Sequence, residues 1–308
     1  MKSPPTILIL YPYFGSFPEW FDLFHETLLR NADVDFLFFT DIEFDRYTAP
    51  NVQHRSMTLS EYAQLCSQKL GINVVLEYSY KICDLRPFFG RIHADEITGY
   101  DFYGYGDVDL IWGDLRSFYT PNLLKKFDVF STHSDVLSGH FSLFRNTIAN
   151  RNLMFNVVED FEEKIHSIKH CGTDEKLFLD LYIWTNSSLA GSKIPIWKWF
   201  RKKQQFRLFL QEQYTTPFIP KPWLDGSINS NQPECWVYKN GQITNQRDVG
   251  RQFMYLHFMN FKSAAHRADG TPAPWQGRDR ICFASPSDME KGISIGPNGI
   301  YPLGEEEC

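Results

Sequence analysis

Two carboxylates stand two positions apart in the segment Gly106-Asp-Val-Asp109, directly after a run of apolar and aromatic residues. At the end of a strand such side chains reach an exposed sheet edge, where their oxygens suit a hard divalent cation. The cation positions that the two acids leave open would be available to phosphate oxygens. The segment therefore predicts a cation site, although two acids in a solvated turn give the same pattern without any ligand.

Three further patterns are weaker candidates for chemistry. His166, His170 and Cys171 have the spacing of zinc ligands on one helix, but no second Cys or His pair accompanies them. Ser138-Gly139-His140 lacks the G-x-S-x-G pattern of a nucleophile elbow. No glycine-rich phosphate loop follows the first apolar run. We therefore expect structural roles for these segments.

Short apolar runs alternate with helical patterns in the first half of the chain, which predicts an α/β fold with an at least partly parallel sheet. Strands are expected over residues 6–11, 34–40, 100–112, 127–132 and 139–144. Helices are expected over residues 18–30, over residues 60–70 before Gly71, and over residues 80–92 with an interruption near Pro87.

The second half of the chain is less regular. A helix capped by Thr173 is expected over residues 173–182, and Asn240-Gly241 predicts a hairpin over residues 235–245. Residues 255–262 have the pattern of a last strand. A mixture of aromatic and basic residues predicts a helical segment over residues 194–214, of which residues 197–210 either lie in a membrane interface or pack on the protein itself.

Composition and charge exclude several classes of protein. The 308 residues carry a net charge of −6, which is not a nucleic-acid-binding balance. No apolar run approaches the roughly 20 residues that span a bilayer, so we expect neither a secretion signal nor a membrane span. The six cysteines are scattered without a C-x-x-C pair, which argues against a disulfide framework and favours a reducing cytoplasm.

Several motifs together resemble the GT-A glycosyltransferases: the D-x-D acids, the β-α-β start, and the late segment His257-Phe-Met-Asn-Phe-Lys262. Tyr80-Lys-Ile-Cys-Asp-Leu-Arg-Pro87 and the block over residues 100–114 are similar to bacterial GT-A-like proteins found with capsule and O-antigen genes. The resemblance implies a Rossmann-like nucleotide-diphospho-sugar transferase fold, with a mixed, mostly parallel sheet flanked by helices. It also implies a catalytic domain over residues 1–262 and a C-terminal extension over residues 263–308.

The resemblance implies a site for Mn²⁺ or Mg²⁺ held against a nucleotide diphosphate by Asp107, Asp109 and His257. Asp107 would also face the ribose or the sugar, and Lys262 would meet phosphate, as in the glycogenin-like His and Lys motif. Unlike that motif, this chain has no Gly between His257 and Lys262. A hydrogen-bonded core imidazole and a charge at a strand end are the alternatives.

The same resemblance implies further contacts to the nucleotide-sugar donor. Tyr11 and Asp41, at the ends of the first two expected strands, fall where GT-A folds hold the base and the ribose. Lys81, Asp84 and Arg86 are assigned to the nucleotide sugar because they lie in the matching helix motif. The alternative for each is an ordinary polar or structural residue.

Asp174 and Glu175 lie where inverting GT-A enzymes carry the carboxylate that deprotonates the acceptor hydroxyl, so they are the expected catalytic residues. Acids in a first helical turn also stabilise a helix without chemistry. These acids favour inversion of the anomeric configuration, whereas the glycogenin-like His257 and Lys262 favour retention, so the stereochemical outcome stays open.

The resemblance and the motifs thus predict a metal-dependent hexosyltransferase. It would use a UDP-sugar, such as a galactose donor, and a saccharide or lipid-linked saccharide acceptor, in bacterial surface polysaccharide synthesis. We expect it in the cytoplasm or peripherally at the inner membrane face. A non-catalytic nucleotide- or sugar-binding protein of the same fold and a nucleotide-sugar hydrolase are the alternatives.

Overall fold

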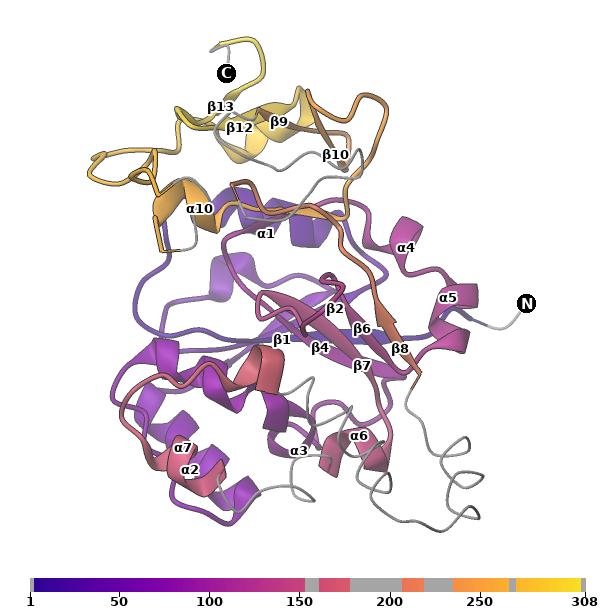
Figure 1. The fold of residues 1–308 in the computed structure, drawn as a ribbon, viewed down its shortest axis with the longest axis vertical. Helices are drawn as coiled ribbons and strands as arrows, with labels where there is room; N and C mark the ends of the chain where they lie inside the picture. Colours follow the sequence, from indigo (N-terminus) through magenta and orange to yellow (C-terminus); the bar gives the residue numbers. More distant parts are fainter. Residues whose placement is uncertain (1–2, 153–160, 178–206, 219–234, 266–269, 306–308) are drawn as a thin grey trace. The chain divides into compact units, whose positions relative to one another are not determined.

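The computed structural model describes residues 3–152, 161–177, 207–218, 235–265 and 270–305, and the chain folds into two compact units (Figure 1). The first unit comprises Met1–Ser16, Asp33–Gly106 and Thr120–Glu212. The second comprises Phe17–Ala32, Asp107–Tyr119 and Gln213–Cys308. Each unit therefore combines stretches that are distant in the sequence. The expected boundary at residue 262, between a catalytic domain and a C-terminal extension, stays a prediction.

A seven-stranded sheet in the order β3-β2-β1-β4-β7-β6-β8 forms the centre of the first unit. Its strands are β1 (Ile7–Pro12), β2 (Asp35–Thr40), β3 (Val52–Ser56), β4 (Phe102–Gly106), β6 (Val129–Ser131), β7 (Phe141–Arg145) and β8 (Leu208–Leu210). Strand β7 pairs antiparallel with both neighbours, and the other pairs are parallel. The predicted α/β class with a mixed, mostly parallel sheet is confirmed.

Helices cover the sheet, as its apolar sequence requires. Both faces of β1 are buried, which is typical of a parallel sheet covered on two sides. Leu8 and Leu10 share a core with residues of α2, η2, α3 and α7. Figure 1 shows α2, α3, α6 and α7 together beside the sheet. The helices of this unit are η1 (Asp45–Tyr47), α2 (Leu59–Leu70), η2 (Ser79–Phe88), α3 (Phe89–Ile92), α5 (Pro121–Lys126), α6 (Ile148–Asn152), α7 (Phe161–His166) and the π-helix η4 (Thr173–Leu177).

Helix α2 shows why local signals predict some elements well. Thr58 and Glu61 form a capping box, in which each side chain accepts a hydrogen bond from the other residue's backbone N–H. The helix ends at Gly71, which has a φ of 73°. Because glycine adopts this left-handed conformation without steric cost, it stops the helix there. The predicted helix over residues 60–70 is confirmed.

The single strand predicted over residues 100–112 is wrong. The chain forms β4 in the first unit and then β5 (Leu110–Trp112) in the second, with Asp107 and Asp109 in the connection. At Gly106, an added Cβ would lie 2.5 Å from the Tyr11 hydroxyl oxygen. The chain therefore leaves the sheet at a residue that needs to be glycine, and the two acids lie in a turn between strands.

Two smaller sheets form the second unit. Strands β10 (Gln242–Asn245), β9 (Trp236–Lys239), β12 (Ile293–Gly296) and β13 (Gly299–Pro302) form one sheet, and β5 pairs antiparallel with β11 (Tyr255–His257). The other elements are α1 (Phe21–Leu29), α4 (Leu115–Phe118), α10 (Met259–Lys262) and η6 (Pro286–Glu290). The predicted hairpin is confirmed: Asn240 and Gly241 have φ values of 53° and 76°, which a type I′ turn requires.

Two further expectations are corrected. The strand predicted over residues 255–262 ends at His257, and Met259–Lys262 form the helical turn α10. Phe261 is fully buried in that turn, and the Asn260 amide donates to the Pro217 carbonyl, so packing favours the turn over an extended strand. Cys235 is disulfide-bonded, whereas the sequence argued against a disulfide framework.

The segments from residue 173 onward are described in part. The expected helix over residues 173–182 is the π-helix η4 as far as Leu177, and the rest lies outside the described residues. The expected helical segment over residues 194–214 is contradicted at Leu208–Leu210, which form β8 because they pair in parallel with β6. Residues 197–206 lie outside the described part, so their membrane contact stays a prediction. None of the helices in the described part is both long and apolar enough to span a bilayer.

A buried ion pair fastens the segment over residues 161–177 to η2. The Lys81 ammonium donates to the Asp84 carboxylate over 2.8 Å and to the carbonyls of Lys164 and Lys169. Asp84 also accepts from the backbone N–H groups of Cys171 and Thr173. Burial alone would raise the pKa of Asp84, but Lys81 and these N–H donors hold that pKa below its ordinary value.

We predict that Asp84→Asn lowers the free energy of unfolding by about 3–5 kcal/mol, because it leaves the Lys81 ammonium buried without a counter-charge. Urea unfolding measures the loss. Since the folded-state pKa of Asp84 lies below the unfolded value of about 3.9, its contribution is present above that pH and is lost as the pH falls through the folded pKa.

The matched control is Asp95→Asn. Asp95 pairs with Lys69 at the surface, where its side chain is 78% exposed, so this change should leave stability nearly unaltered. Equal effects of the two variants would contradict a dominant role for the buried pair.

Candidate functional site

The register of β5 against β11 brings three predicted ligands together in the second unit. His257 pairs with Leu110, the residue that follows Asp109. The Phe258 N–H donates to the Asp109 carbonyl over 3.3 Å, which extends the pairing past the strand end. The imidazole and the D-x-D acids are therefore neighbours, although about 150 positions separate them in the sequence.

The ligand atoms that this cluster offers suit a divalent cation. One ligand atom from each of Asp107, Asp109 and His257 lies within 4.8 Å of the others. The His257 Nε2 atom is 3.7 Å from Asp109 Oδ2. Asp109 and His257 are buried, and Asp107 is half-buried. Two carboxylates and an imidazole on one side leave coordination positions for oxygens of a bound molecule.

Lys262 supplies a positive charge to the same cluster. Its ammonium lies 2.7 Å from Asp109 Oδ2, at the end of the turn α10. Burial alone would raise the pKa of Asp109, but the Lys262 ammonium and the His257 imidazole lower that pKa below its ordinary value. The Asp109 carboxylate is thus ionised at neutral pH and able to act as a ligand.

Two supporting residues were not identified from the sequence. The Thr216 hydroxyl oxygen lies 3.1 Å from His257 Nδ1, so that a proton on Nδ1 leaves the lone pair on Nε2, the atom that faces Asp109. The Trp20 indole donates to the Val108 carbonyl over 2.9 Å, and Lys262 lies over its ring. No local pattern marks either residue, because their roles arise from contacts between distant stretches of chain.

Arg86, Asp174 and Glu175 lie in the first unit around Gly139, which precedes β7 by two residues. The Arg86 guanidinium pairs with Asp174 Oδ2 over 2.9 Å and also donates to the Gly139 carbonyl. An added Cβ on Gly139 would lie 2.9 Å from Glu175 Oε1, so this backbone approaches the two acids closely. The catalytic role expected for Asp174 and Glu175 stays a prediction.

The other predicted donor contacts also lie in the first unit. Tyr11 is buried and stacks on Phe38, with ring centroids 4.7 Å apart. Asp41 follows β2 and accepts from the Gly15 N–H over 2.9 Å, which links the carboxyl ends of β1 and β2. Lys81 and Asp84 have the internal partners described above. The donor-binding roles of these residues stay predictions.

The zinc alternative receives no support in the described part of the chain. His166, His170 and Cys171 do not bring three ligand atoms together there, whereas Asp107, Asp109 and His257 do. The His170 ring instead packs against Tyr80, with ring centroids 4.7 Å apart.

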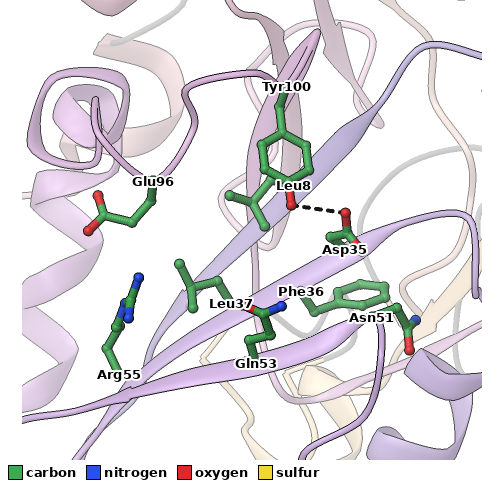
Figure 2. Close-up of a pocket in the computed structure, with 9 residues that line it drawn as sticks. All are labelled: Leu8, Asp35, Phe36, Leu37, Asn51, Gln53, Arg55, Glu96 and Tyr100. Carbon is green, nitrogen blue, oxygen red and sulfur yellow. Dashed lines mark hydrogen bonds between the residues drawn. The ribbon is translucent and has the colours of Figure 1, made fainter.

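A separate pocket lies in the first unit, at the amino ends of its parallel strands (Figure 2). Its lining includes Leu37, Arg55 and Glu96, and the Tyr100 hydroxyl donates to Asp35 across it over 2.9 Å. Burial and this hydrogen bond raise the pKa of Tyr100 to about 12. With a volume of about 80 Å³ the pocket is too small for a nucleotide sugar, and it contains none of the predicted site residues.

Comparisons with known proteins give a family and several distant structures. The model of the Family of unknown function (DUF6625) matches residues 9–276. A search of the curated proteins finds no match. Among solved structures, the galactosyltransferase LgtC with donor and acceptor sugar analogs is 10% identical, with a TM-score of 0.37 over 62% of this chain and 81% of that one.

Two other solved structures are similar at the same level. Mouse xyloside xylosyltransferase 1 is 12% identical, with a TM-score of 0.40 over 60% of this chain and 82% of that one. The glycosyltransferase GlyE of Streptococcus pneumoniae TIGR4 is 13% identical, with a TM-score of 0.34 over 73% of this chain and 57% of that one.

We predict that Thr216→Val weakens Mn²⁺ binding by about 10–100-fold, because the valine keeps the shape of threonine but cannot fix the His257 ring by a hydrogen bond. Isothermal titration of the protein with Mn²⁺ measures the change. Thr215→Val is the matched control, since the neighbouring threonine meets His257 through its backbone carbonyl, which the change retains. Equal affinities of the two variants would show that the Thr216 hydroxyl does not support a metal ligand.

Proposed function

The chain belongs to the Family of unknown function (DUF6625), and we propose that it is a metal-dependent glycosyltransferase. It transfers a sugar, most simply a hexose such as galactose, from a UDP-sugar to a saccharide or lipid-linked saccharide. The setting is bacterial surface polysaccharide synthesis, at the cytoplasmic side of the membrane. One observation carries the proposal: Asp107, Asp109 and His257 converge, and Lys262 contacts the same carboxylate.

Each group of this cluster has a separate task in the proposed reaction. Asp107, Asp109 and His257 hold Mn²⁺ or Mg²⁺, which when bound neutralises charge on the leaving diphosphate. Lys262 donates to a phosphate oxygen of the nucleotide, for which its position at the Asp109 carboxylate suits it. Trp20 holds the D-x-D turn through Val108, and Thr216 orients His257. The two carboxylates and the ammonium thus match the opposite charges of a metal–diphosphate pair.

The residues of the first unit complete the proposal. Tyr11 lies near the carboxyl end of β1 and Asp41 follows β2, and we assign them to the base and the ribose. We assign Arg86 on η2 to the nucleotide-sugar donor, while Lys81 and Asp84 on the same element support the segment that carries Asp174. Asp174 is held by Arg86, so its carboxylate is fixed in place, and we keep it as the expected catalytic carboxylate.

The experiment that tests the function measures UDP release from UDP-hexoses in the presence of Mn²⁺, with and without disaccharide acceptors. We expect release that needs the acceptor and stops in excess EDTA. Asp109→Ala should abolish turnover because it removes a metal ligand, and a circular dichroism spectrum like that of the wild type shows that the loss does not come from unfolding.

Release that does not need an acceptor would identify a nucleotide-sugar hydrolase. The absence of release, with UDP still bound, would identify a binding protein. Asp279→Asn, a change at an exposed acid of the same unit, is the control that should retain full turnover.

We predict that Lys262→Ala weakens UDP binding by about 1.5–3 kcal/mol, the range for a charge-assisted hydrogen bond. Titration of UDP at saturating Mn²⁺ measures the loss. Lys291→Ala, at an exposed lysine of the same unit, controls for the change of net charge alone. Unchanged UDP affinity in Lys262→Ala would show that Lys262 does not bind UDP and acts only as a counter-charge for Asp109.

A further inference from the structure

The pocket of the first unit is lined by polar groups that the proposed function does not use (Figure 2). Its apolar lining includes Leu8 and Leu37, which are 4% and 6% exposed. Its polar lining consists of Asp35, Asn51, Gln53, Arg55, Glu96 and Tyr100. All of these residues belong to the first unit. Charged groups of both signs therefore line one cavity together with buried apolar side chains.

The pairing of β2 with β3 gathers several of these groups on one face of the sheet. Leu37 pairs with Gln53, and side chains two positions apart on a strand share a face. Asp35 therefore lies on the face of Leu37, and Arg55 lies on the face of Gln53. The connection between α3 and β4 adds Glu96 to the lining. The register of the sheet and this connection thus bring the charged groups to one pocket.

Glu96 is a largely buried carboxylate for which the described residues supply no cationic partner. Its side chain is 20% exposed, and its Oε2 atom lies 3.9 Å from His93 Nδ1. Burial lowers the pKa of His93 to about 3, so this imidazole is uncharged at neutral pH. A buried charge costs free energy unless an opposite charge or hydrogen bonds compensate it. The environment of Glu96 therefore favours a bound cation.

Arg55 brings the opposite charge to the same pocket. Figure 2 shows its guanidinium and the Glu96 side chain on one side of the pocket. No carboxylate in the described part of the chain forms an ion pair with this guanidinium, Glu96 included. Two opposite charges that line one cavity without pairing suit a molecule that carries both charges itself.

Asp35 is the second carboxylate of the pocket, and Tyr100 orients it. The Tyr100 hydroxyl donates to Asp35 Oδ2 over 2.9 Å. Within the described ranges no hydrogen bond reaches the other oxygen, Oδ1. Asp35 and Glu96 belong to no cluster of three metal-ligating groups among the described residues, so an organic ammonium suits them better than a metal ion.

The volume of the pocket limits the size of the ligand. A cavity holds one water for each 10–15 Å³ or so, and about 80 Å³ therefore has room for roughly five to eight water-sized groups. Glycine, alanine, serine and threonine have that many non-hydrogen atoms. A nucleotide or a disaccharide is too large.

We propose that this pocket binds a compact zwitterion, a free α-amino acid no larger than threonine. The ammonium group of the ligand donates to the Glu96 and Asp35 carboxylates, and its carboxylate accepts from the Arg55 guanidinium. The short side chain contacts Leu8 and Leu37. Two carboxylates against one guanidinium leave an excess of negative charge, so a ligand with a carboxylate alone is repelled.

This inference goes beyond the proposed function. The pocket lies at the amino ends of the parallel strands, whereas Tyr11 and Asp41, which we assign to the nucleotide, lie at their carboxyl ends. The amino acid is therefore a separate ligand, and its binding does not require UDP or Mn²⁺.

Isothermal titration of the full chain with glycine, L-alanine and L-serine, in the absence of UDP and Mn²⁺, tests the inference. We expect saturable binding of one molecule per chain. L-Lactate lacks the ammonium group and ethylamine lacks the carboxylate. Each should bind about 10–100-fold more weakly than L-alanine, the effect of losing a charge-assisted hydrogen bond.

Variants then locate the site. Glu96→Gln and Arg55→Gln should each weaken L-alanine binding by about 10–100-fold. Glu163→Gln and Lys126→Gln, at exposed residues of the same unit, are the matched controls and should bind as the wild type does. Glu96→Gln should also reduce the preference for L-alanine over L-lactate, whereas unfolding would remove the binding of both.

The absence of saturable binding for all three amino acids overturns the inference. It is also overturned if L-lactate or ethylamine binds as tightly as L-alanine, because then one charge suffices. Wild-type affinity for L-alanine in both pocket variants would place the ligand elsewhere and overturn the assignment. Since these titrations contain neither UDP nor Mn²⁺, their failure leaves the proposed transferase intact, and a failure of sugar transfer leaves this inference intact.

Discussion

The buried carboxylate of Asp109 is the constraint on which the second unit's site depends. Asp109 is only 7% exposed, and removing a carboxylate from water costs several kcal/mol unless opposite charge and hydrogen bonds compensate. Lys262 and His257 provide that compensation: His257 lies in the strand that pairs with β5, and Lys262 ends the turn α10 that follows it. In an extended chain the two residues would lie roughly 16 Å apart, too far to share one carboxylate. The turn α10 shortens that separation, so the charge of Asp109 and the local fold depend on each other.

Local signals explain which elements the sequence predicts correctly. The capping box and Gly71 define α2, and Asn240-Gly241 defines the β9–β10 hairpin, because each signal acts within a few residues. The break at Gly106 is different. It depends on the distant Tyr11 hydroxyl, which a Cβ at position 106 would contact. The need for glycine at the last residue of β4 therefore comes from a contact that only the folded sheet creates.

The candidate site likewise contains some residues that a local sequence pattern identifies and others that only the folded structure identifies. Asp107 and Asp109 are recognisable because carboxylates two positions apart after an apolar run form a local pattern that suits a cation, although a solvated turn gives the same pattern. Thr216 and Trp20 are not, since a threonine before a proline and one of eight tryptophans carry no distinguishing local pattern. Their value comes from hydrogen bonds to His257 and Val108 that arise once the chain has paired. Residues that orient ligands are generally harder to find than the ligands themselves.

The charged residues of η2 show how contacts inside the protein distinguish structural residues from candidate ligand-binding residues. Lys81 and Asp84 satisfy each other and four backbone groups, so their burial is explained without any ligand. The same contacts hold the stretch that carries Asp174, which then meets Arg86 two positions further along η2. The buried Lys81–Asp84 pair thus fixes one end of a segment whose next ion pair, between Asp174 and Arg86, lies beside Gly139, just before β7. The motif over residues 80–87 combines both tasks, because one turn of helix directs Lys81 and Asp84 into the protein and Arg86 toward the edge.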